Sequence, residues 1–411
     1  AQMADDALDV QHRNRIHSGE RLVEQHEFGL GRQGAGDLDP SALSAGQADS
    51  EAVAHVAYVK LLHELFQRGL PRSTVQDWIN RLIEERCLVQ KEEKRGRTPA
   101  RYVASSAMLS TACRRIFTTV DGDMVAIFHE CRSGGCAAFC AFHHRQAGGV
   151  LSDVSRDGML LHEYATIGKK GADIGLYPSA AVGVIGVRKD NGYIVQRIRC
   201  TGGPAYSLTD MMAMAEGVVH ISVEKTGHVV EGDVVTRALT HIIIGIDDTD
   251  SPEGGATFAL ALGLLQFLGK MEGIIPIGHR VAMLDPSCSY RTAGNSCSYI
   301  ELAAEPGLLS QIRETAVRFV ADESLSPEWG IAIRRGFTIS PALRAFGLKA
   351  RESSVSREEA EAVAQSSGVD LEGNRGIIGA LAAVGLRGLP HEVLLDPARN
   401  PETTPRSEGN N

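Results

Sequence analysis

The sequence has no excess of positive charge and no long apolar run, and these two absences limit its partners. Among 411 residues, 42 are Lys or Arg and 51 are Asp or Glu, which gives a formal net charge of −9. A basic surface extending over the whole chain is therefore excluded, and any contact with RNA or DNA must be local. No apolar run reaches the roughly 18 residues that a membrane-spanning helix needs, so we expect no membrane partner.

The sequence also lacks pairs of C-x-x-C motifs and a recognisable secretory signal. Its eight cysteines are scattered along the chain. This arrangement is typical of a reducing compartment, and we expect a cytoplasmic protein. Hydrophobic residues at 43% and charged residues at 23% are ordinary for a globular protein, and a chain of this length predicts several domains.

Composition and pattern divide the chain into five segments. Residues 1–50 have few aliphatic side chains and predict a disordered tail, and residues 396–411 predict a flexible tail. Residues 51–105 predict a small winged helix-turn-helix domain, and residues 113–240 an α/β domain of unknown role. Residues 241–395 hold the motifs with chemical content. The expected fold class is α/β, in the mixed α+β sense.

The winged-helix prediction depends on two apolar helical patterns followed by two short strands. Residues 53–66 have helical spacing, and Ser73 is a suitable N-cap for a second helix. The segments 88–90 (Leu-Val-Gln) and 102–103 (Tyr-Val) then flank a charged turn, as in a wing that contacts phosphates. The candidate nucleic-acid contacts are Arg72, Lys94, Arg95 and Arg97. The alternative is a winged helix used only for packing or dimerisation.

A third pattern is a cluster of soft ligands, Cys131, Cys136 and Cys140, which precedes two histidines at 143 and 144. Such residues could hold zinc or an iron–sulfur cluster. The spacing matches no pair of C-x-x-C knuckles, however, and we favour buried free cysteines on a helix. Further along, residues 180–187 and 193–199 flank a Lys-Asp-Asn-Gly turn and predict a β-hairpin.

The most informative stretch is residues 241–268. Residues 242–246 are isoleucines interrupted by one glycine, which predicts a strand buried on both faces. Asp247, Asp248 and Asp250 follow at once, and then the pair Gly254 and Gly255. Residues 256–268 are almost wholly apolar and predict a buried helix.

A strand, a glycine-containing loop and a helix start form a phosphate-binding layout. Carboxylates next to phosphate require a cation between them, and Mg²⁺ is the usual one. We therefore predict a magnesium–nucleotide site with Asp247, Asp248 and Asp250 as ligands. Thr249 and Ser251 of the same loop are further candidates for nucleotide contact. The alternative is a solvated acidic turn that caps the helix.

The stretch GIDDTDSPEGGATF at 245–258 resembles the signature of TiaS, the archaeal synthetase that makes agmatinylcytidine in an isoleucine tRNA. The segments MLDP at 283–286, YRTAGN at 290–295 and GIIGALAAVG at 376–385 are similar to further TiaS segments in the same order. With MLDP and YRTAGN counted as one stretch, these are three separate motifs, and three are much more specific than one. The chain is also similar to the methanogenesis-marker relatives of TiaS, which would imply a modification or assembly role.

The resemblance implies an ATP-dependent, kinase-like α/β domain followed by a ferredoxin-like domain. It also implies that Thr257 acts as a phosphate ligand or phosphoryl carrier. Arg291 would neutralise charge on the transferred group. The alternative is that Arg291 is simply a surface residue. Asn295 is a further candidate for nucleotide contact. The family's Cys-Thr-Thr is Ala256-Thr257-Phe258 in this chain.

Three functional hypotheses follow from these patterns. The first is an ATP- and Mg²⁺-dependent kinase or synthetase, a ligase or phosphotransferase that activates an RNA base or a similar substrate. The second is a DNA-binding transcriptional regulator in which the TiaS-like part senses a nucleotide. The third is an accessory modification protein that handles metal or sulfur through its cysteines. Neither the acceptor substrate nor an oligomeric state follows from the sequence.

Overall fold

The structure is a computed structural model, and its described residues all follow Pro71. It describes residues 72–84, 88–92, 101–104, 113–206, 208, 211–292 and 294–399. The predicted tail at 1–50, the predicted first helix at 53–66, the wing residues Lys94, Arg95 and Arg97, and residues 400–411 lie outside these ranges.

Helix α5 (Arg72–Glu84) is followed by strands β1 (Leu88–Glu92) and β2 (Arg101–Ala104). The two strands pair antiparallel, with Val89 opposite Val103. This order of helix and paired strands matches the second helix and the wing strands expected from the sequence. The winged-helix domain as a whole stays a prediction, because its first helix lies outside the described residues.

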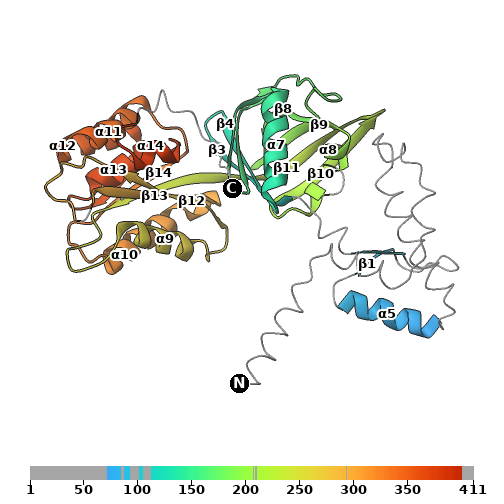
Figure 1. Ribbon diagram of the computed structural model, residues 1–411, viewed down its shortest axis with the longest axis horizontal. Coiled ribbons are helices and arrows are strands. Elements are labelled where there is room, and N and C mark those ends of the chain that lie inside the picture. Colours follow the sequence, from blue (N-terminus) through green and yellow to red (C-terminus); the bar gives the residue numbers. More distant parts are fainter. Residues whose placement is uncertain are drawn as a thin grey trace. The chain divides into compact units, whose positions relative to one another are not determined.

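The first lobe begins with a curved antiparallel sheet whose strand order is β5–β6–β4–β3. Its strands are β3 (Cys113–Asp121), β4 (Met124–Cys131), β5 (Leu151–Asp157) and β6 (Leu160–Thr166). Helix α7 (Gly134–Ala147) packs on this sheet, and the hydroxyl of its N-cap, Ser133, accepts a hydrogen bond from the Cys136 backbone (Figure 1).

The rest of the first lobe contains the hairpin predicted around residue 190. Strands β8 (Val182–Asp190) and β9 (Tyr193–Thr201) pair antiparallel. Both turn residues, Asn191 and Gly192, have positive φ, as the tight hairpin turn requires. The remaining elements are β7 (Gly168–Lys169), α8 (Gly203–Tyr206), η2 (Met212–Met214) and β10 (Val218–Thr226).

Strand β11 (Val229–Asp247) joins the two lobes and crosses residue 241, where the sequence suggested a domain boundary (Figure 1). Its residues 229–236 pair with β9 and β10, and residues 238–240 pair with β3. Its last part pairs with β13 and β14. Burial alternates along the first part and becomes continuous from Leu239 to Ile246, which confirms the predicted doubly buried strand.

The second lobe is an antiparallel sheet in the order β12–β13–β11–β14–β15. The strands that flank β11 are β12 (Ile274–Met283), β13 (Ser296–Ala304), β14 (Gly330–Arg335) and β15 (Val369–Gly373). Helices α9 (Thr257–Leu268) and α10 (Leu309–Glu323), with the short η3 (Pro306–Leu308), cover one face. The opposite face carries α11 (Pro341–Glu352), α12 (Arg357–Ser367), α13 (Ile377–Gly385) and α14 (His391–Leu395).

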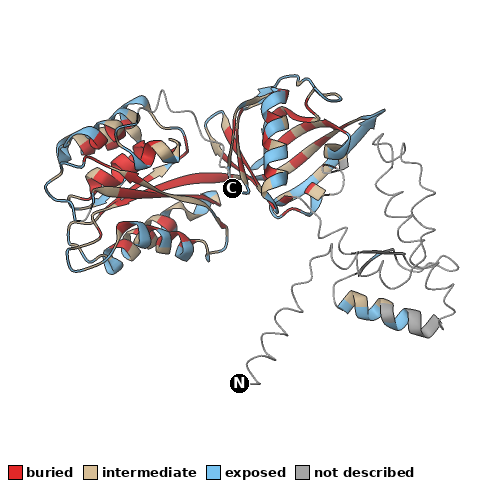
Figure 2. Ribbon diagram, in the orientation of Figure 1, coloured by how far each residue is buried: buried red, intermediate tan, exposed pale blue. Residues whose placement is uncertain are grey.

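Each face of this sheet has its own core, because neighbouring strand residues point to opposite sides. Ile242, Ile244 and Ile246 pack with α9 and α10, whereas Ile243 packs with α11 and α13. In Figure 2 the central strands of this lobe have the buried colour, and so do parts of the helices on both faces of the sheet. The mixed α/β class expected from the sequence is confirmed. The division into kinase-like and ferredoxin-like domains stays a prediction.

Glycine allows α13 to lie directly on β11. A Cβ atom added to Gly245 would be 2.0 Å from the carbonyl oxygen of Ala380, and one added to Gly376 would be 2.4 Å from the Gly330 nitrogen. The small-residue segment at 376–385 therefore packs closely on another backbone, as its composition predicted.

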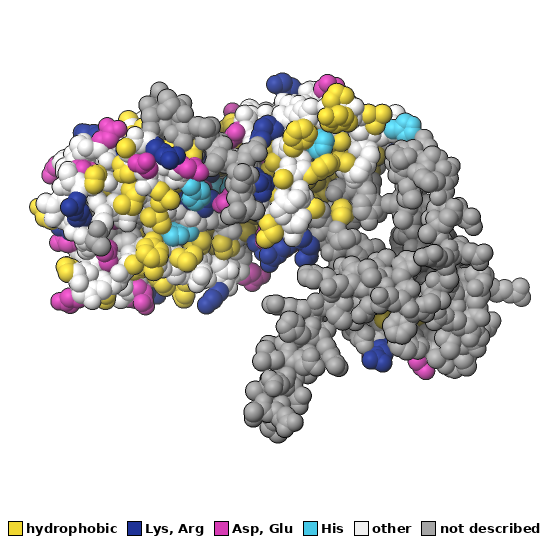
Figure 3. Space-filling model, in the orientation of Figure 1, with side chains coloured by type: hydrophobic (Ala, Val, Ile, Leu, Met, Phe, Trp, Pro, Cys, Tyr) yellow, Lys and Arg dark blue, Asp and Glu magenta, His cyan; other side chains and the backbone are white. Residues whose placement is uncertain are grey.

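The buried helix predicted after the aspartates, α9, is buried on one face only. One face of α9 packs in the core through Leu264 and Leu268, but Phe258 is 53% exposed and Phe267 is 46% exposed. The reason is that α9 lies on the outside of the sheet, so its outer face meets solvent. Apolar side chains are visible on this side of the lobe in Figure 3.

Within the described residues, no helix has the length and apolar character of a membrane span.

Candidate functional site

A cavity of about 170 Å³ lies at the C-terminal end of β11. Its walls are the aspartate loop, the loop between β12 and β13, the segment after α11 and the first turn of α13. The structure thus brings Asp247, Asp248 and Asp250 together with Arg291 and Asn295, although the two groups are far apart in the sequence. The other predicted residues of the aspartate loop and helix start do not line this cavity, although they are close to Asp250 in the sequence. They are Thr249, Ser251, Gly254, Gly255 and Thr257.

Asp247 ends β11, and its side chain lies against the first turn of α13. A Cβ atom at Gly379 would be 1.6 Å from Oδ2 of Asp247, so glycine is needed at that position. Burial, and then the neighbouring charge of Asp248, raise the pKa of Asp247 well above its ordinary value. This carboxylate is therefore held where its negative charge is poorly solvated.

Asp248 has a φ of 56°, a left-handed conformation that is uncommon for a residue other than glycine. Its Oδ2 accepts a hydrogen bond of 3.0 Å from Nε of Arg375. Burial raises the pKa of Asp248 even though Arg375 opposes the shift. The guanidinium carbon of Arg375 also lies 4.5 Å from the centroid of the Tyr290 ring, a cation–π distance.

Arg375 is a site residue that sequence reasoning missed. It lines the cavity, yet it is 127 positions from its partner Asp248. The only signal was its position directly before the third TiaS-like segment, which begins at Gly376. Loop arginines next to a motif are common on surfaces, so the sequence alone gave no reason to select it.

Asp250 is oriented by two threonines. Its Oδ1 accepts a 3.0 Å hydrogen bond from the Thr257 hydroxyl, and its Oδ2 accepts a 2.8 Å bond from the Thr292 hydroxyl. Thr257 is the first residue of α9, and only 5% of it is exposed. Its oxygen also accepts a 3.1 Å bond from the Thr249 hydroxyl. Asp250 is thus the nearest base to Thr257.

The paired glycines, Gly254 and Gly255, lie in the tight turn that follows the aspartates. The backbones of Ser251 and Gly254 exchange hydrogen bonds of 2.9 and 3.1 Å around a tight turn. Gly255 has a φ of 89°, and a Cβ atom there would be 3.2 Å from Cα of Asp250. The predicted contact of these glycines with phosphate stays a prediction. The helix start that borders the cavity is that of α13, through Ile378 and Gly379.

The loop between β12 and β13 forms the opposite wall. Asp285 accepts hydrogen bonds from the backbone and hydroxyl of Ser287, which lower its pKa. The Asn295 side chain donates a 2.8 Å bond to the Asp285 carbonyl, so it supports the loop while it lines the cavity. Arg291 and Tyr290 line the cavity and are both exposed.

The cysteine cluster has a different environment. Cys131 lies at the end of β4, and Cys136 and Cys140 lie on α7. Burial raises the pKa of Cys131 and of Cys140 to about 12, so these thiols stay protonated at neutral pH. The following histidines have other partners: His143 accepts a bond from the Ala181 backbone, and His144 is bonded to Glu163.

Across the part of the chain that the structure describes, no group of three or more His, Cys, Asp or Glu residues is arranged around a common metal position. For the aspartates the reason is visible in their contacts. Asp247 faces Gly379, Asp248 faces Arg375, and Asp250 faces Thr257. A shared cation would require at least Asp248 to exchange Arg375 for the metal.

No protein-family model matches the chain, but curated proteins do. An uncharacterized protein of Methanocaldococcus jannaschii is 28% identical over 268 residues, which is 63% of this chain and 87% of that protein. The isoleucine-tRNA 2-agmatinylcytidine synthetase TiaS of Pyrococcus horikoshii is 33% identical over 162 residues, or 37% of each chain. TiaS of Pyrobaculum neutrophilum is 32% identical over 155 residues, or 35% of each chain.

The solved structures that resemble the chain include a crystal structure of TiaS in complex with its isoleucine tRNA and ATP. It has 25% identity and a TM-score of 0.33, and it covers 36% of each chain. The sequence relationship confirms the predicted resemblance to TiaS over about a third of the chain. This chain spans 37% of the length of the Pyrococcus TiaS.

Proposed function

We propose that this TiaS-related protein is an ATP- and Mg²⁺-dependent phosphotransferase or ligase that activates an RNA base or a chemically similar acceptor. The main support is the convergence of three carboxylates and two arginines on one cavity, at Asp247, Asp248, Asp250, Arg291 and Arg375. This is the combination that phosphoryl-transfer sites use to hold a metal and to balance phosphate charge. The relatives named TiaS are tRNA-modifying synthetases.

The carboxylates fit a divalent cation by their electrostatics. The raised pKa values of Asp247 and Asp248 indicate negative charge that the protein solvates poorly. A cation would relieve that penalty, and Mg²⁺ prefers one or two carboxylates together with phosphate oxygens. Asp248 and Asp250 would bind the cation, and Asp247 would add negative charge next to them. When bound, the metal would neutralise charge on the phosphates.

The other residues would position the nucleotide and move a proton. Arg291 and Arg375 lie on the cavity wall, where their guanidinium groups can contact phosphate oxygens bidentately. If Thr257 acts as the phosphoryl carrier, its hydroxyl oxygen forms a bond to the terminal phosphorus of ATP as the bond to ADP breaks. Asp250, 3.0 Å away, would then accept the hydroxyl proton.

The regulator hypothesis has one observation in its favour. Helix α5 and the antiparallel pair of β1 and β2 follow the order of a recognition helix and wing. The hypothesis predicts that reversing the charges of Arg95 and Arg97 abolishes DNA binding. An enzyme with a small or RNA substrate would keep its phosphoryl transfer in the same variant.

The enzyme proposal is tested by transfer of radiolabelled γ-phosphate from ATP to the protein itself or to bulk tRNA. We expect Mg²⁺-dependent transfer by the wild type and a loss of roughly 100-fold or more in Asp248→Asn. Asp322→Asn removes an exposed acid of α10 away from the cavity and should transfer normally. Full activity in a folded Asp248→Asn variant would refute the assignment.

A further inference from the structure

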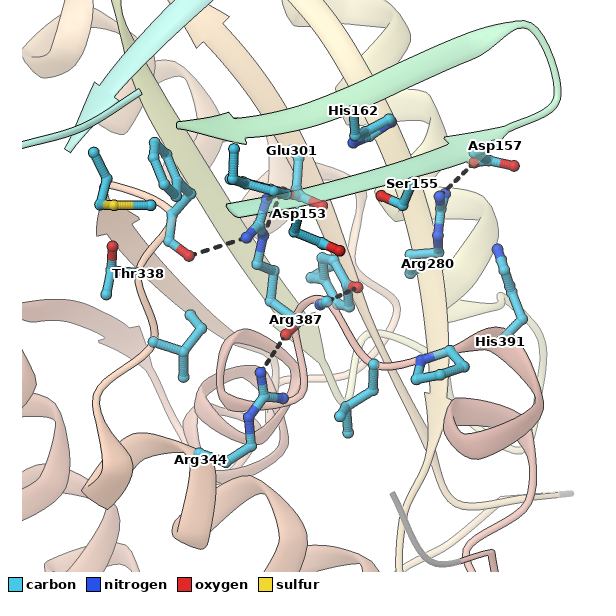
Figure 4. A pocket seen from close by; sticks show the side chains of 18 of the residues that line it. Asp153, Ser155, Asp157, His162, Arg280, Glu301, Thr338, Arg344, Arg387 and His391 are labelled. Carbon is cyan, nitrogen blue, oxygen red and sulfur yellow. Dashed lines mark hydrogen bonds and ion pairs between the residues drawn. The ribbon is translucent and has the colours of Figure 1, made fainter. Parts of the chain in front are cut away.

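A second and larger cavity, of about 480 Å³, lies between the two lobes. We call it the Arg387 cavity, after the buried arginine in its wall (Figure 4). Strands β5 and β6 supply one side of it. The other side comes from β12, β13, the start of α11 and the turn after α13. Its volume is within the range of about 300–1,000 Å³ that is typical of small-molecule sites.

The Arg387 cavity is separate from the cavity at Asp247, Asp248 and Asp250, which we call the nucleotide cavity after the function proposed for it. Helices α11 and α13 reach both, but at opposite ends. Arg344 near the start of α11 and Arg387 just after α13 line the Arg387 cavity. Ala350 near the end of α11 and Gly379 in the first turn of α13 line the nucleotide cavity. The inference that follows is therefore independent of the proposed function.

Arg387 is fixed rigidly in the wall, where it is only 7% exposed. Its Nε donates to Glu301 at 2.7 Å, one terminal nitrogen donates to the Phe337 carbonyl at 3.0 Å, and the other to the Tyr164 hydroxyl at 2.7 Å. Glu301 is also bonded to His241 at 2.8 Å. The guanidinium is thus oriented by groups from both lobes before any ligand arrives.

This wall offers hydrogen-bond donors that the described residues leave without acceptors. Three of the five N–H groups of Arg387 have partners, and two do not. The Tyr164 oxygen accepts from Arg387, and the Tyr299 oxygen accepts from the Gly388 backbone at 3.4 Å. The hydroxyl hydrogens of both tyrosines remain available. A donor-rich wall favours a ligand that supplies acceptor oxygens.

The charges around the cavity also favour an anion. The lining contains four arginines and three acids, a net charge of +1 (4 − 3) in a chain of −9: Arg156, Arg280, Arg344 and Arg387 against Asp153, Asp157 and Glu301. Glu301 is held by Arg387, and Asp157 pairs with Arg280. Burial lowers the pKa of His162 to about 4, so this imidazole is neutral at pH 7 and does not add to the charge.

The rest of the lining is apolar or hydroxylated. Phe337, Leu389 and Pro390 provide an apolar wall, and Ser155 and Thr338 provide hydroxyl groups. In Figure 4, Arg280 with Asp157 lies at one end of the cavity and Arg344 lies beside Arg387. Two aspartates on the β5 side, Asp153 and Asp157, would repel a ligand with several negative charges. A triphosphate is therefore a poor occupant.

We propose that the Arg387 cavity binds a small organic anion, in which a single carboxylate or phosphate group meets the Arg387 wall and an apolar or ring portion packs against Phe337 and Leu389. A carboxylate and a phosphate both accept hydrogen bonds from a guanidinium and from tyrosine hydroxyls. The probe that binds shows which of the two the cavity takes.

The test is calorimetric titration of the full chain with phenyl phosphate and, separately, with benzoate. We expect the wild type to bind one or both. Ser155→Trp places a bulky side chain in the cavity, and Tyr164→Phe removes only a hydroxyl. Both variants should weaken binding, by roughly ten-fold or more for Ser155→Trp and several-fold for Tyr164→Phe. The second variant preserves the test if the first does not fold.

Two control variants should bind the probes as the wild type does. Arg313→Gln removes an exposed arginine of α10 that pairs with Glu372, and Asp248→Asn disables the nucleotide cavity. Binding of phenyl phosphate alone assigns a phosphate ligand, and binding of benzoate alone assigns a carboxylate. If the wild type binds neither probe, or if folded Ser155→Trp and Tyr164→Phe bind as the wild type does, the proposal is overturned.

Discussion

The two cavities hold their carboxylates in opposite electrostatic environments. In the nucleotide cavity, burial raises the pKa of Asp247 and of Asp248, and the ion pair between Asp248 and Arg375 does not offset the shift. In the Arg387 cavity, burial alone would raise the pKa of Glu301. The charge of Arg387 and the bond from His241 hold it below its ordinary value instead.

This difference separates carboxylates whose negative charge is poorly balanced from a carboxylate that has its own cationic partner. Under the proposed function, a bound cation would balance the aspartate cluster. The charge of Glu301 is balanced by Arg387, and Arg387 has two further N–H groups that can donate to a ligand. The predictions that follow test this contrast, from the largest expected effect to the smallest.

Replacing Arg387 with Met should cause the largest loss of stability. It would leave Glu301 buried with only His241 as a partner, and breaking one side of a buried ion pair typically costs about 3–5 kcal/mol. Urea unfolding measures the loss. Arg313→Met, at an exposed pair, should change stability by no more than about 0.5 kcal/mol. A loss below about 1 kcal/mol in Arg387→Met would mean that the pair is not needed to balance Glu301.

Adding one methyl group at Gly379 should damage the nucleotide cavity. The new Cβ atom would overlap Asp247, and overpacking of this kind costs about 1–3 kcal/mol. We also expect roughly ten-fold weaker Mg-ATP binding, because Asp247 or α13 must move. Gly263→Ala is the matched control, since Gly263 lies within α9 and its nearest neighbour, Phe319, is 3.7 Å away. That variant should gain about 0.5–1 kcal/mol from helix propensity.

Asp247→Asn should stabilise the protein at pH 7 in the absence of metal. The pKa of this acid is raised in the folded state, so its ionised form disfavours folding. Stability should therefore rise as the pH falls through the raised pKa towards the ordinary value of 3.8. The asparagine variant should lose that rise. Thermal unfolding from about pH 4 to pH 7, without Mg²⁺, measures both effects.

The Glu301 pair has the opposite pH dependence. Its pKa is lowered in the folded state, so the stability it contributes is present above its ordinary pKa of 4.5 and decreases as the pH falls below that value. In Glu301→Gln, this loss below pH 4.5 should disappear. A wild type in which both carboxylates shift stability in the same direction would contradict the contrast between the cavities.

The sequence predicted the parts of the site that lie close together along the chain. The isoleucines at 242–246 identified the buried strand, and the carboxylates after it identified the candidate ligands. The helix was placed correctly, but its exposed face was not foreseen, because an apolar run does not reveal how many layers cover it. Phe258 and Phe267 are the residues that depart from that expectation.

The parts that could not be predicted are those brought together by the antiparallel order of strands. Arg375 reaches Asp248 across 127 positions, and Arg387 reaches Tyr164 across 223. Neither arginine has a local pattern that distinguishes it from a surface residue. These distances are set by the pairing of β11 with β13 and β14, by the path from β11 through β3 and β4 to β6, and by the glycine contacts that place α13 on β11.

The most direct test of the central claim is calorimetric titration of the wild type with ATP, with and without Mg²⁺, at neutral pH. The account predicts binding that requires Mg²⁺, because only a cation relieves the repulsion between the aspartates and the phosphates. Binding of equal strength without Mg²⁺, or no binding under either condition, would contradict a metal–nucleotide site at Asp247, Asp248 and Asp250.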